Sequence, residues 1–153
     1  MMKIAKLIPE FDLCTGCNIC MLTCCEENFG GYNPRYAMLK VEDLKDGIFV
    51  EPVACNQCDN AACERVCPVS AISKKNIIKK DNEGNEISLE VVSINNEKCT
   101  GCGRCEEYCP KGVIVIKDKK AYKCELCDGE PACIKNCPKG AIKLYREGVE
   151  KND

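Results

Sequence analysis

The chain has 153 residues, enough for one compact unit or two small ones. Its formal net charge of −2, from 22 Lys and Arg against 24 Asp and Glu, argues against a nucleic-acid-binding protein, which would present a basic face. The absence of His excludes Rieske clusters, haem held by His and His-assisted catalysis.

The predicted elements are short, and they fill the intervals between groups of cysteines. We expect short helical turns that begin near the last Cys of each group, with a longer one after Cys24 that runs through Glu26 and Glu27. Runs of apolar and β-branched residues bounded by turn residues predict strands over 37–42 and 48–53, a hairpin over 77–94, a second hairpin of 113–116 and 120–123, and a last strand over 142–145.

The cysteines fall into four groups of four. The first and third groups share gaps of two, two and three residues and open with Cys-Thr-Gly-Cys, whereas the second and fourth have a middle gap of four or five residues and the same final gap of three. The chain is therefore a duplicated two-motif unit. The groups are Cys14, Cys17, Cys20 and Cys24; Cys55, Cys58, Cys63 and Cys67; Cys99, Cys102, Cys105 and Cys109; and Cys124, Cys127, Cys133 and Cys137.

Seventeen Cys beside five Tyr, three Phe and no Trp imply a thin apolar core that disulfides or metal must reinforce. Residues 1–10 lack the apolar stretch and cleavage site of a secretory signal, and no apolar run approaches the length of a membrane span. A cytosolic protein keeps its thiols reduced, and the number of cysteines is odd. We therefore expect a cytoplasmic chain without a membrane segment, whose cysteines bind metal.

The spacing within each group is typical of [4Fe–4S] ligands. A Cys-x2-Cys loop lets successive thiolates reach adjacent irons of one cluster, and a fourth Cys, often followed by Pro, binds the other cluster of a pair. Three groups end in Cys-Pro, and Gly16 and Gly101 are expected to let backbone N–H groups turn toward the sulfides. Zinc, the alternative, would not explain the third and fourth Cys of each group. Sixteen cysteines are thus candidate iron ligands, and no residue is a candidate for catalysis.

Cys25 is the cysteine left over. It is either a free thiol on a short helix, which we favour, or it replaces Cys24 as a ligand. The final gap of three residues, which all four groups share, favours Cys24.

Two runs of lysines also have two explanations. They either offset the negative charge of the clusters and guide docking, or they form a solvated surface, which we favour. The lysines are Lys74, Lys75, Lys79 and Lys80 in one segment and Lys117, Lys119, Lys120 and Lys123 in the other.

Several segments together form a pattern that covers most of the chain: Cys14-Thr15-Gly16-Cys17-Asn18-Ile19-Cys20, Glu26-Glu27-Asn28, and Cys137-Pro138-Lys139-Gly140-Ala141-Ile142. This pattern resembles the four-cluster ferredoxin-type subunits of pterin-dependent molybdenum or tungsten oxidoreductases, and of some hydrogenases and carbon monoxide dehydrogenases. The resemblance implies four [4Fe–4S] clusters, since no ligand is replaced. It also implies an α+β fold of two fused bacterial-ferredoxin-like two-cluster modules, with short strands, hairpins and short helices around the clusters.

The family pairs its motifs in a nested way, the first with the fourth and the second with the third. Within one polyferredoxin unit over 1–153, this implies module A from 1–35 plus 118–153 and module B from 50–115. Sequential pairing is equally compatible with the spacing alone. Carried over by position, the nested ligands are set 1, Cys14, Cys17, Cys20 and Cys137; set 2, Cys55, Cys58, Cys63 and Cys109; set 3, Cys99, Cys102, Cys105 and Cys67; and set 4, Cys124, Cys127, Cys133 and Cys24.

The resemblance implies a function in electron transfer and no enzymatic activity of the chain alone. The expected partner is a large catalytic subunit of the pterin molybdenum or tungsten kind, with a soluble ferredoxin or a further redox subunit as a second partner. The segment Asn33-Pro34-Arg35-Tyr36-Ala37 resembles small subunits of aldehyde oxidoreductases, although a Pro-bounded loop entering a strand explains it equally well. The alternatives are a subunit of a hydrogenase, formate dehydrogenase or carbon monoxide dehydrogenase, and a free diffusible polyferredoxin. A catalytic or sensory cluster protein is disfavoured, because the ligand sets are complete and His is absent.

Overall fold

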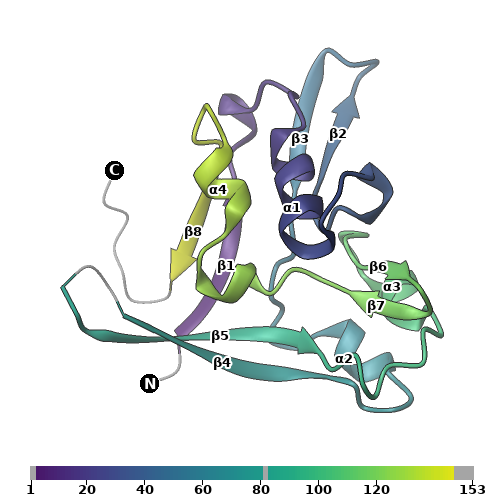
Figure 1. The fold of residues 1–153 in the computed structure, drawn as a ribbon. Coiled ribbons are helices and arrows are strands. Elements are labelled where there is room, and N and C mark those ends of the chain that lie inside the picture. The colour runs from purple at the N-terminus through teal and green to yellow at the C-terminus, as the bar shows by residue number, and fades with distance from the viewer. Residues whose placement is uncertain (1–2, 81–82, 147–153) are drawn as a thin grey trace.

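The computed structural model describes residues 3–80 and 83–146, and its largest sheet runs through the middle of the molecule (Figure 1). The strand order is β4-β5-β1-β8. The hairpin of β4 (Ile72–Lys80) and β5 (Glu86–Ile94) is antiparallel, β5 pairs in parallel with β1 (Lys3–Pro9), and β1 pairs antiparallel with β8 (Ile142–Arg146). The strand near the start of the chain therefore joins the central hairpin to the last strand.

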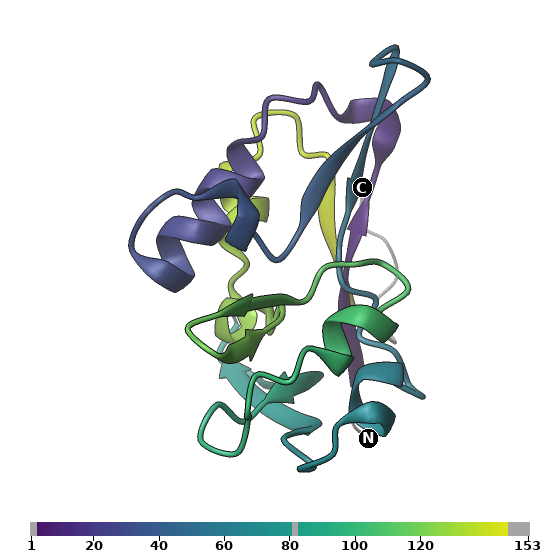
Figure 2. The ribbon, with the colours of Figure 1, turned by 90° about the vertical axis from the view of Figure 1, so that its right-hand side faces the viewer.

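The helices pack in two pairs. The longest, α1 (Ile19–Phe29), lies against α4 (Ala132–Asn136), and α2 (Ala62–Val66) lies against α3 (Arg104–Tyr108). Both views place the first pair in one half of the molecule and the second pair in the other (Figures 1 and 2). Elements from the first and fourth cysteine groups thus lie together, as do elements from the second and third.

Strand β5 separates two apolar cores. Successive side chains of a strand point to opposite faces, and on β5 Leu89 and Val91 belong to one core whereas Val92 and Ile94 belong to the other. The first core contains Cys20 and Cys24 of α1 and Cys133 of α4, and the second contains the cysteines of α2 and α3. A single strand buried on both faces therefore serves both halves.

Two further hairpins pack on these cores, the first through Val41 on the first core and the second through residues on both cores. They are formed by β2 (Lys40–Leu44) with β3 (Phe49–Val53), and by β6 (Val115–Lys117) with β7 (Lys120–Tyr122). The 3-10 turns η1 (Phe11–Leu13), η2 (Pro34–Tyr36) and η3 (Leu126–Gly129) complete the fold. The predicted hairpins are all present with shifted boundaries. The largest shifts are at β4, which begins at Ile72 rather than at residue 77, and at β2, which begins at Lys40 rather than at residue 37. Residues 81–82, in the predicted turn of the 77–94 hairpin, lie outside the described residues.

The short helices lie before the last Cys of their groups, whereas the prediction placed them after it. We expected helical turns to begin near the last Cys of each group, but α2, α3 and α4 end immediately before Cys67, Cys109 and Cys137. Each of these cysteines precedes Pro, and the proline ring disfavours the helical conformation of the residue before it. Strand β1 was not predicted, since it is specified by its pairing with β5 and β8.

Candidate metal centres

Three pockets are each lined by four cysteines and by apolar neighbours. The cysteines of set 1 surround a pocket with Val41, Pro52 and Ile142. Those of set 2 share a pocket with Val92 and Ile114, and those of set 3 line a pocket with residues that include Ile72, Ile94 and Ala121. Each pocket takes three cysteines from one group and the last cysteine of another.

The cysteines of set 4 also lie near one another, between α1 and α4. Cys24 is on α1 and Cys133 on α4. Burial, followed by the neighbouring thiols of Cys124, Cys127 and Cys24, raises the pKa of Cys133. In the described residues, no group of three Cys, Asp or Glu is arranged to hold a single metal ion.

A shared backbone conformation shapes the first Cys-x2-Cys loop of every group. The residue before the second Cys has a positive φ in all four loops: +74° at Gly16, +48° at Gln57, +73° at Gly101 and +59° at Leu126. Glycine adopts this conformation without steric cost, whereas Gln and Leu do so rarely. The two glycines were expected from the sequence. Gln57 and Leu126 were not expected, although they occupy the same position of the repeat as the two glycines.

Backbone N–H groups point at cysteine sulfurs throughout the site. Gln57 N and Leu126 N donate to the Sγ atoms of Cys55 and Cys124, the ligands two residues before them, at 3.4 and 3.5 Å. Further bonds of this kind join Met38 N to Cys24 at 3.4 Å, Ala71 N to Cys67 at 3.2 Å, Ala121 N to Cys99 at 3.3 Å and Ala141 N to Cys137 at 3.3 Å. Such donors stabilise negative charge on sulfur.

Burial dominates the acidity of the thiols. It raises the pKa of Cys20, Cys24 and Cys105 to about 11 and that of Cys124 to about 12, against the lowering effect of nearby N–H donors. Metal ligation requires the thiolate, so loading these sites releases protons. Cys17 and Cys102, by contrast, are exposed.

Cys24 and Cys25 point to different surroundings. The Sγ of Cys24 accepts hydrogen bonds from Met38 N and, at 3.8 Å, from Asn28 Nδ2, and the Cys127 thiol contributes to its raised pKa after burial. The fully buried Cys25 donates its thiol hydrogen to the Asn33 carbonyl at 3.1 Å. The segment 33–37 thus covers the Cys25 side of α1.

Several lysines of the two runs form ion pairs at the surface, whereas Lys123 is buried. Lys74 pairs with Glu90 at 3.2 Å, Lys75 with Glu125 at 3.1 Å and Lys79 with Glu130 at 2.6 Å. Two of these three pairs join β4 to residues within the fourth cysteine group. The interpretation of Lys123 as a solvated residue is wrong, since its side chain is only 4% exposed. Its neighbours are separated from it by 31 and 66 residues in the sequence, so no local pattern announced this burial.

Comparison with known families gives two matches. A model described as a 4Fe-4S dicluster domain matches residues 54–113, which contain the second and third cysteine groups. A model described as a 4Fe-4S binding domain matches residues 11–33 together with 125–140, which join the first group to most of the fourth. In the described residues, no helix is long and apolar enough to cross a bilayer.

Three relatives illustrate the similarity. An uncharacterised ferredoxin of Methanocaldococcus jannaschii is 39% identical over 125 residues, which cover 82% of this chain and 62% of the relative. YsaA of Escherichia coli, named as an electron transport protein, is 30% identical over 78% of this chain and 74% of its own length. The polyferredoxin-like subunit of the aliphatic sulfonate oxidoreductase of Pyrococcus furiosus is 34% identical over 70% of this chain and 60% of that subunit. This chain spans less than two thirds of the first and third relatives.

A solved structure shares the fold. A chain of the active site complex BamBC of benzoyl coenzyme A reductase, with benzoyl-CoA, superposes with a TM-score of 0.52 at 22% identity, covering 94% of this chain and 80% of that one. The family matches, the relatives and the grouped cysteines agree with one another. The chain belongs to the ferredoxin-type 4Fe-4S family, whose relatives named above include a ferredoxin, an electron transport protein and a polyferredoxin-like subunit of an oxidoreductase.

Proposed function

We propose that this chain transfers electrons through four [4Fe–4S] clusters as the iron–sulfur subunit of a larger redox enzyme, with sets 1 to 4 as the ligands. The observation that carries the proposal is the arrangement of sixteen cysteines in four sets of four. Three of the sets line pockets, and the fourth lies between α1 and α4. When bound, a [4Fe–4S] cluster accepts and releases one electron.

The residues present suit these clusters. Each set supplies four sulfur donors, the pockets are walled by apolar side chains, and backbone amides are aimed at the sulfurs. The apolar walls exclude water, and the amides stabilise the negative charge that a thiolate-ligated cluster carries. The split family match, which joins the first group to the fourth, supports nested rather than sequential pairing and the division into modules A and B.

Neighbouring thiols indicate an order for the sets. Cys20 of set 1 acts on the pKa of Cys133 of set 4, and Cys55 of set 2 acts on that of Cys124 of set 4, both after the larger effect of burial. The packing of α2 against α3 brings sets 2 and 3 together. We infer the order set 1, set 4, set 2, set 3. The exposed Cys17 and Cys102 then lie at the two ends, where electrons enter and leave.

The proposed partner is a large catalytic subunit of a tungsten or molybdenum pterin aldehyde oxidoreductase. The relative from Pyrococcus furiosus, a polyferredoxin-like subunit of an oxidoreductase, supports a partner of this general kind. The segment 33–37 supports it less, because its Asn33 carbonyl accepts a hydrogen bond from Cys25 and its residues have a local structural role. A free polyferredoxin is the second candidate, favoured by the similarity to a ferredoxin of Methanocaldococcus jannaschii.

Metal analysis tests the number of clusters. Protein purified without oxygen should contain about 16 iron and about 16 sulfide per chain, four of each for every cluster. About half that iron, or mainly zinc, would refute four clusters. Purification of the chain from its native cell should yield a larger chain in fixed ratio that contains tungsten or molybdenum and oxidises aldehydes. Elution of the chain alone would favour the free polyferredoxin.

Single ligand substitutions test the pairing. With nested pairing, Cys137→Ser and Cys14→Ser perturb the same low-temperature paramagnetic signal, because both residues belong to set 1, and Cys99→Ser perturbs another. If Cys137→Ser and Cys99→Ser instead affect one signal, the pairing is sequential and the ligand sets must be redrawn.

A further inference from the structure

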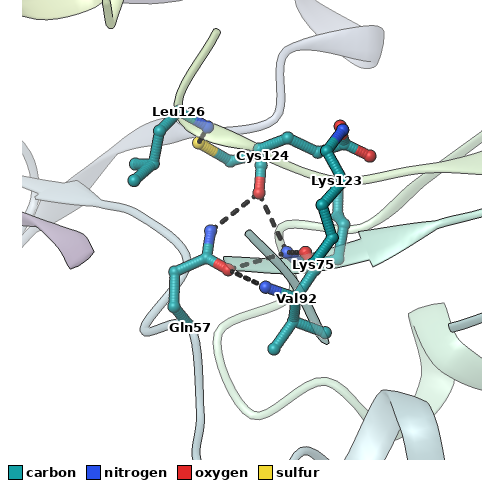
Figure 3. Close-up of polar contacts among 7 residues, drawn as sticks. Gln57, Lys75, Val92, Lys123, Cys124 and Leu126 are labelled. Atoms are coloured by element: carbon teal, nitrogen blue, oxygen red, sulfur yellow. Dashed lines mark hydrogen bonds and ion pairs between the residues drawn. The ribbon is translucent and has the colours of Figure 1, made fainter. Parts of the chain in front are cut away.

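Lys123 lies at the junction of the two halves and makes three hydrogen bonds inside the protein (Figure 3). Its Nζ donates to the Val92 carbonyl, to the Cys124 carbonyl at 2.9 Å and to Gln57 Oε1 at 3.2 Å. The Gln57 side chain, only 3% exposed, in turn donates to the Cys124 carbonyl at 2.7 Å and accepts from Val92 N at 2.8 Å. Two buried polar side chains thus connect the second cysteine group, β5 and the fourth group.

The geometry indicates that Lys123 is charged. An ammonium group has three N–H donors, and three acceptors surround this one, whereas a neutral amine would leave one of them without its donor. No carboxylate of the described residues forms an ion pair with Lys123. A buried charge is costly unless an opposite charge lies nearby. Acidic side chains of the described residues therefore do not supply the counter-charge of Lys123.

The thiolate-ligated clusters proposed for sets 2 and 4 would supply this negative charge on both sides of Lys123. Its side chain lines the pocket of set 2, and it immediately precedes Cys124 of set 4. Lys120, three residues earlier, instead directs its Nζ to the Cys99 carbonyl at 2.6 Å and is not fully buried.

We propose that Lys123 is a fixed positive charge that raises the reduction potentials of the two central clusters, those of sets 2 and 4, above the values they would have without it. This inference rests on the proposed function. Lys123 stabilises the additional negative charge that a reduced neighbour carries, and low accessibility to water keeps this interaction from being screened. Electrons would then reside preferentially in the middle of the chain of clusters rather than at its exposed ends.

Substitution of Lys123 by Met tests the effect of its charge on the reduction potentials. Lys123→Met keeps an unbranched side chain one atom shorter than that of lysine and removes its charge. In redox titrations followed by paramagnetic resonance, two of the four clusters should become harder to reduce by at least tenfold in their reduction equilibrium, a shift of about 59 mV for one electron. The other two should shift by less than threefold. Lys75→Met, which removes an exposed charge paired with Glu125, should leave all four within threefold.

A second variant distinguishes charge from structure. Gln57→Leu disrupts the same hydrogen-bond network but keeps the lysine, and the equivalent position of the fourth group already holds Leu126 in the same backbone conformation. It should lower the thermal midpoint while moving no potential by more than threefold. Equal shifts in Lys123→Met and Gln57→Leu, or no shift in Lys123→Met, would overturn the proposal.

Loss of iron from a variant is also informative. If Lys123→Met and Lys123→Gln both fail to hold their iron whereas Lys123→Arg holds it, a positive charge is required at this place and the proposal stands in a stronger form. If all three lose iron to the same extent, the residue acts through packing and the proposal is wrong. Failure of the wild-type protein to hold about 16 irons would instead refute the proposed function.

Discussion

Gly101 occupies a position in the third cysteine group where the structure leaves no room for a side chain. Its φ is +73°, and a Cβ added there would lie 2.8 Å from Lys119 Cα and closer still to the Lys119 carbonyl group. These are backbone atoms of the tight β6–β7 turn, in which Asp118 and Lys119 also have positive φ, so they cannot move aside as a side chain would. Gly101→Ala must therefore displace the turn or the ligand loop.

Two other glycines of the chain allow the conformational cost of Gly101→Ala to be separated from its steric cost. Gly103 has a φ of +80° with nothing within 4 Å, so Gly103→Ala measures the conformational cost alone, about 1–2 kcal/mol. At Gly16, the equivalent of Gly101 in the first group, a Cβ would meet Val50 Cγ1 at 3.1 Å, which is a side-chain atom that can yield. Gly101→Ala adds a forced overlap of about 1–3 kcal/mol to the conformational cost, giving about 2–5 kcal/mol in total.

Thermal unfolding of the protein, followed by circular dichroism without oxygen at one scan rate, measures these differences. A loss of 1 kcal/mol lowers the midpoint by about 2–4 °C for a chain of this size, so we expect losses of roughly 4–20 °C for Gly101→Ala and roughly 2–8 °C for Gly103→Ala. Displacement of the turn also weakens the Ala121 N–H bond to Cys99, so iron of set 3 should be lost first. If Gly101→Ala unfolds no earlier than Gly103→Ala, the close approach to Lys119 does not constrain the loop.

Two further predictions concern the cysteines and the metal. Cys25→Ser should keep the full iron content, because its thiol is bonded to the Asn33 carbonyl, whereas Cys24→Ser should lose or convert one cluster; the reverse result in metal analysis would move the ligand to Cys25. Removal of iron by acid or a chelator should abolish most of the far-ultraviolet circular dichroism, since ligand-bound metal contributes folding free energy directly and each half has a small apolar core; an apoprotein that unfolds cooperatively would contradict this expectation.

The sequence predicted the cysteine groups, the hairpins and the glycine turns because these depend on local spacing and on residues with special chemistry. It did not predict the ends of α2, α3 and α4 correctly, although the Cys-Pro pairs contained that information. Strand β1 and the burial of Lys123 depend on contacts with β5, more than 30 residues away along the chain, so they were beyond any local pattern. The grouping of the ligands came from resemblance, not from spacing.

The four Cys-x2-Cys loops differ in a way that follows the inferred order of the sets. The first and third groups have Gly at the position of positive φ and an exposed second cysteine, Cys17 or Cys102, and their sets are the two ends of that inferred order. The second and fourth groups, whose sets are central, have Gln57 and Leu126 there, both buried, and half-buried second cysteines.

A bulky residue at positive φ costs about 1–3 kcal/mol, and burial of a leucine side chain returns about 1.5–3 kcal/mol. That exchange is available only where the loop faces the interior, as it does for Leu126, which is fully buried in the first core. At the equivalent positions of the first and third groups, a Cβ would meet the Val50 side chain or the Lys119 backbone, so a larger residue would add steric overlap to the conformational cost, and Gly avoids both. The residue before the second cysteine of each loop therefore distinguishes the two motifs that the proposed order places in the centre from the two that it places at the ends.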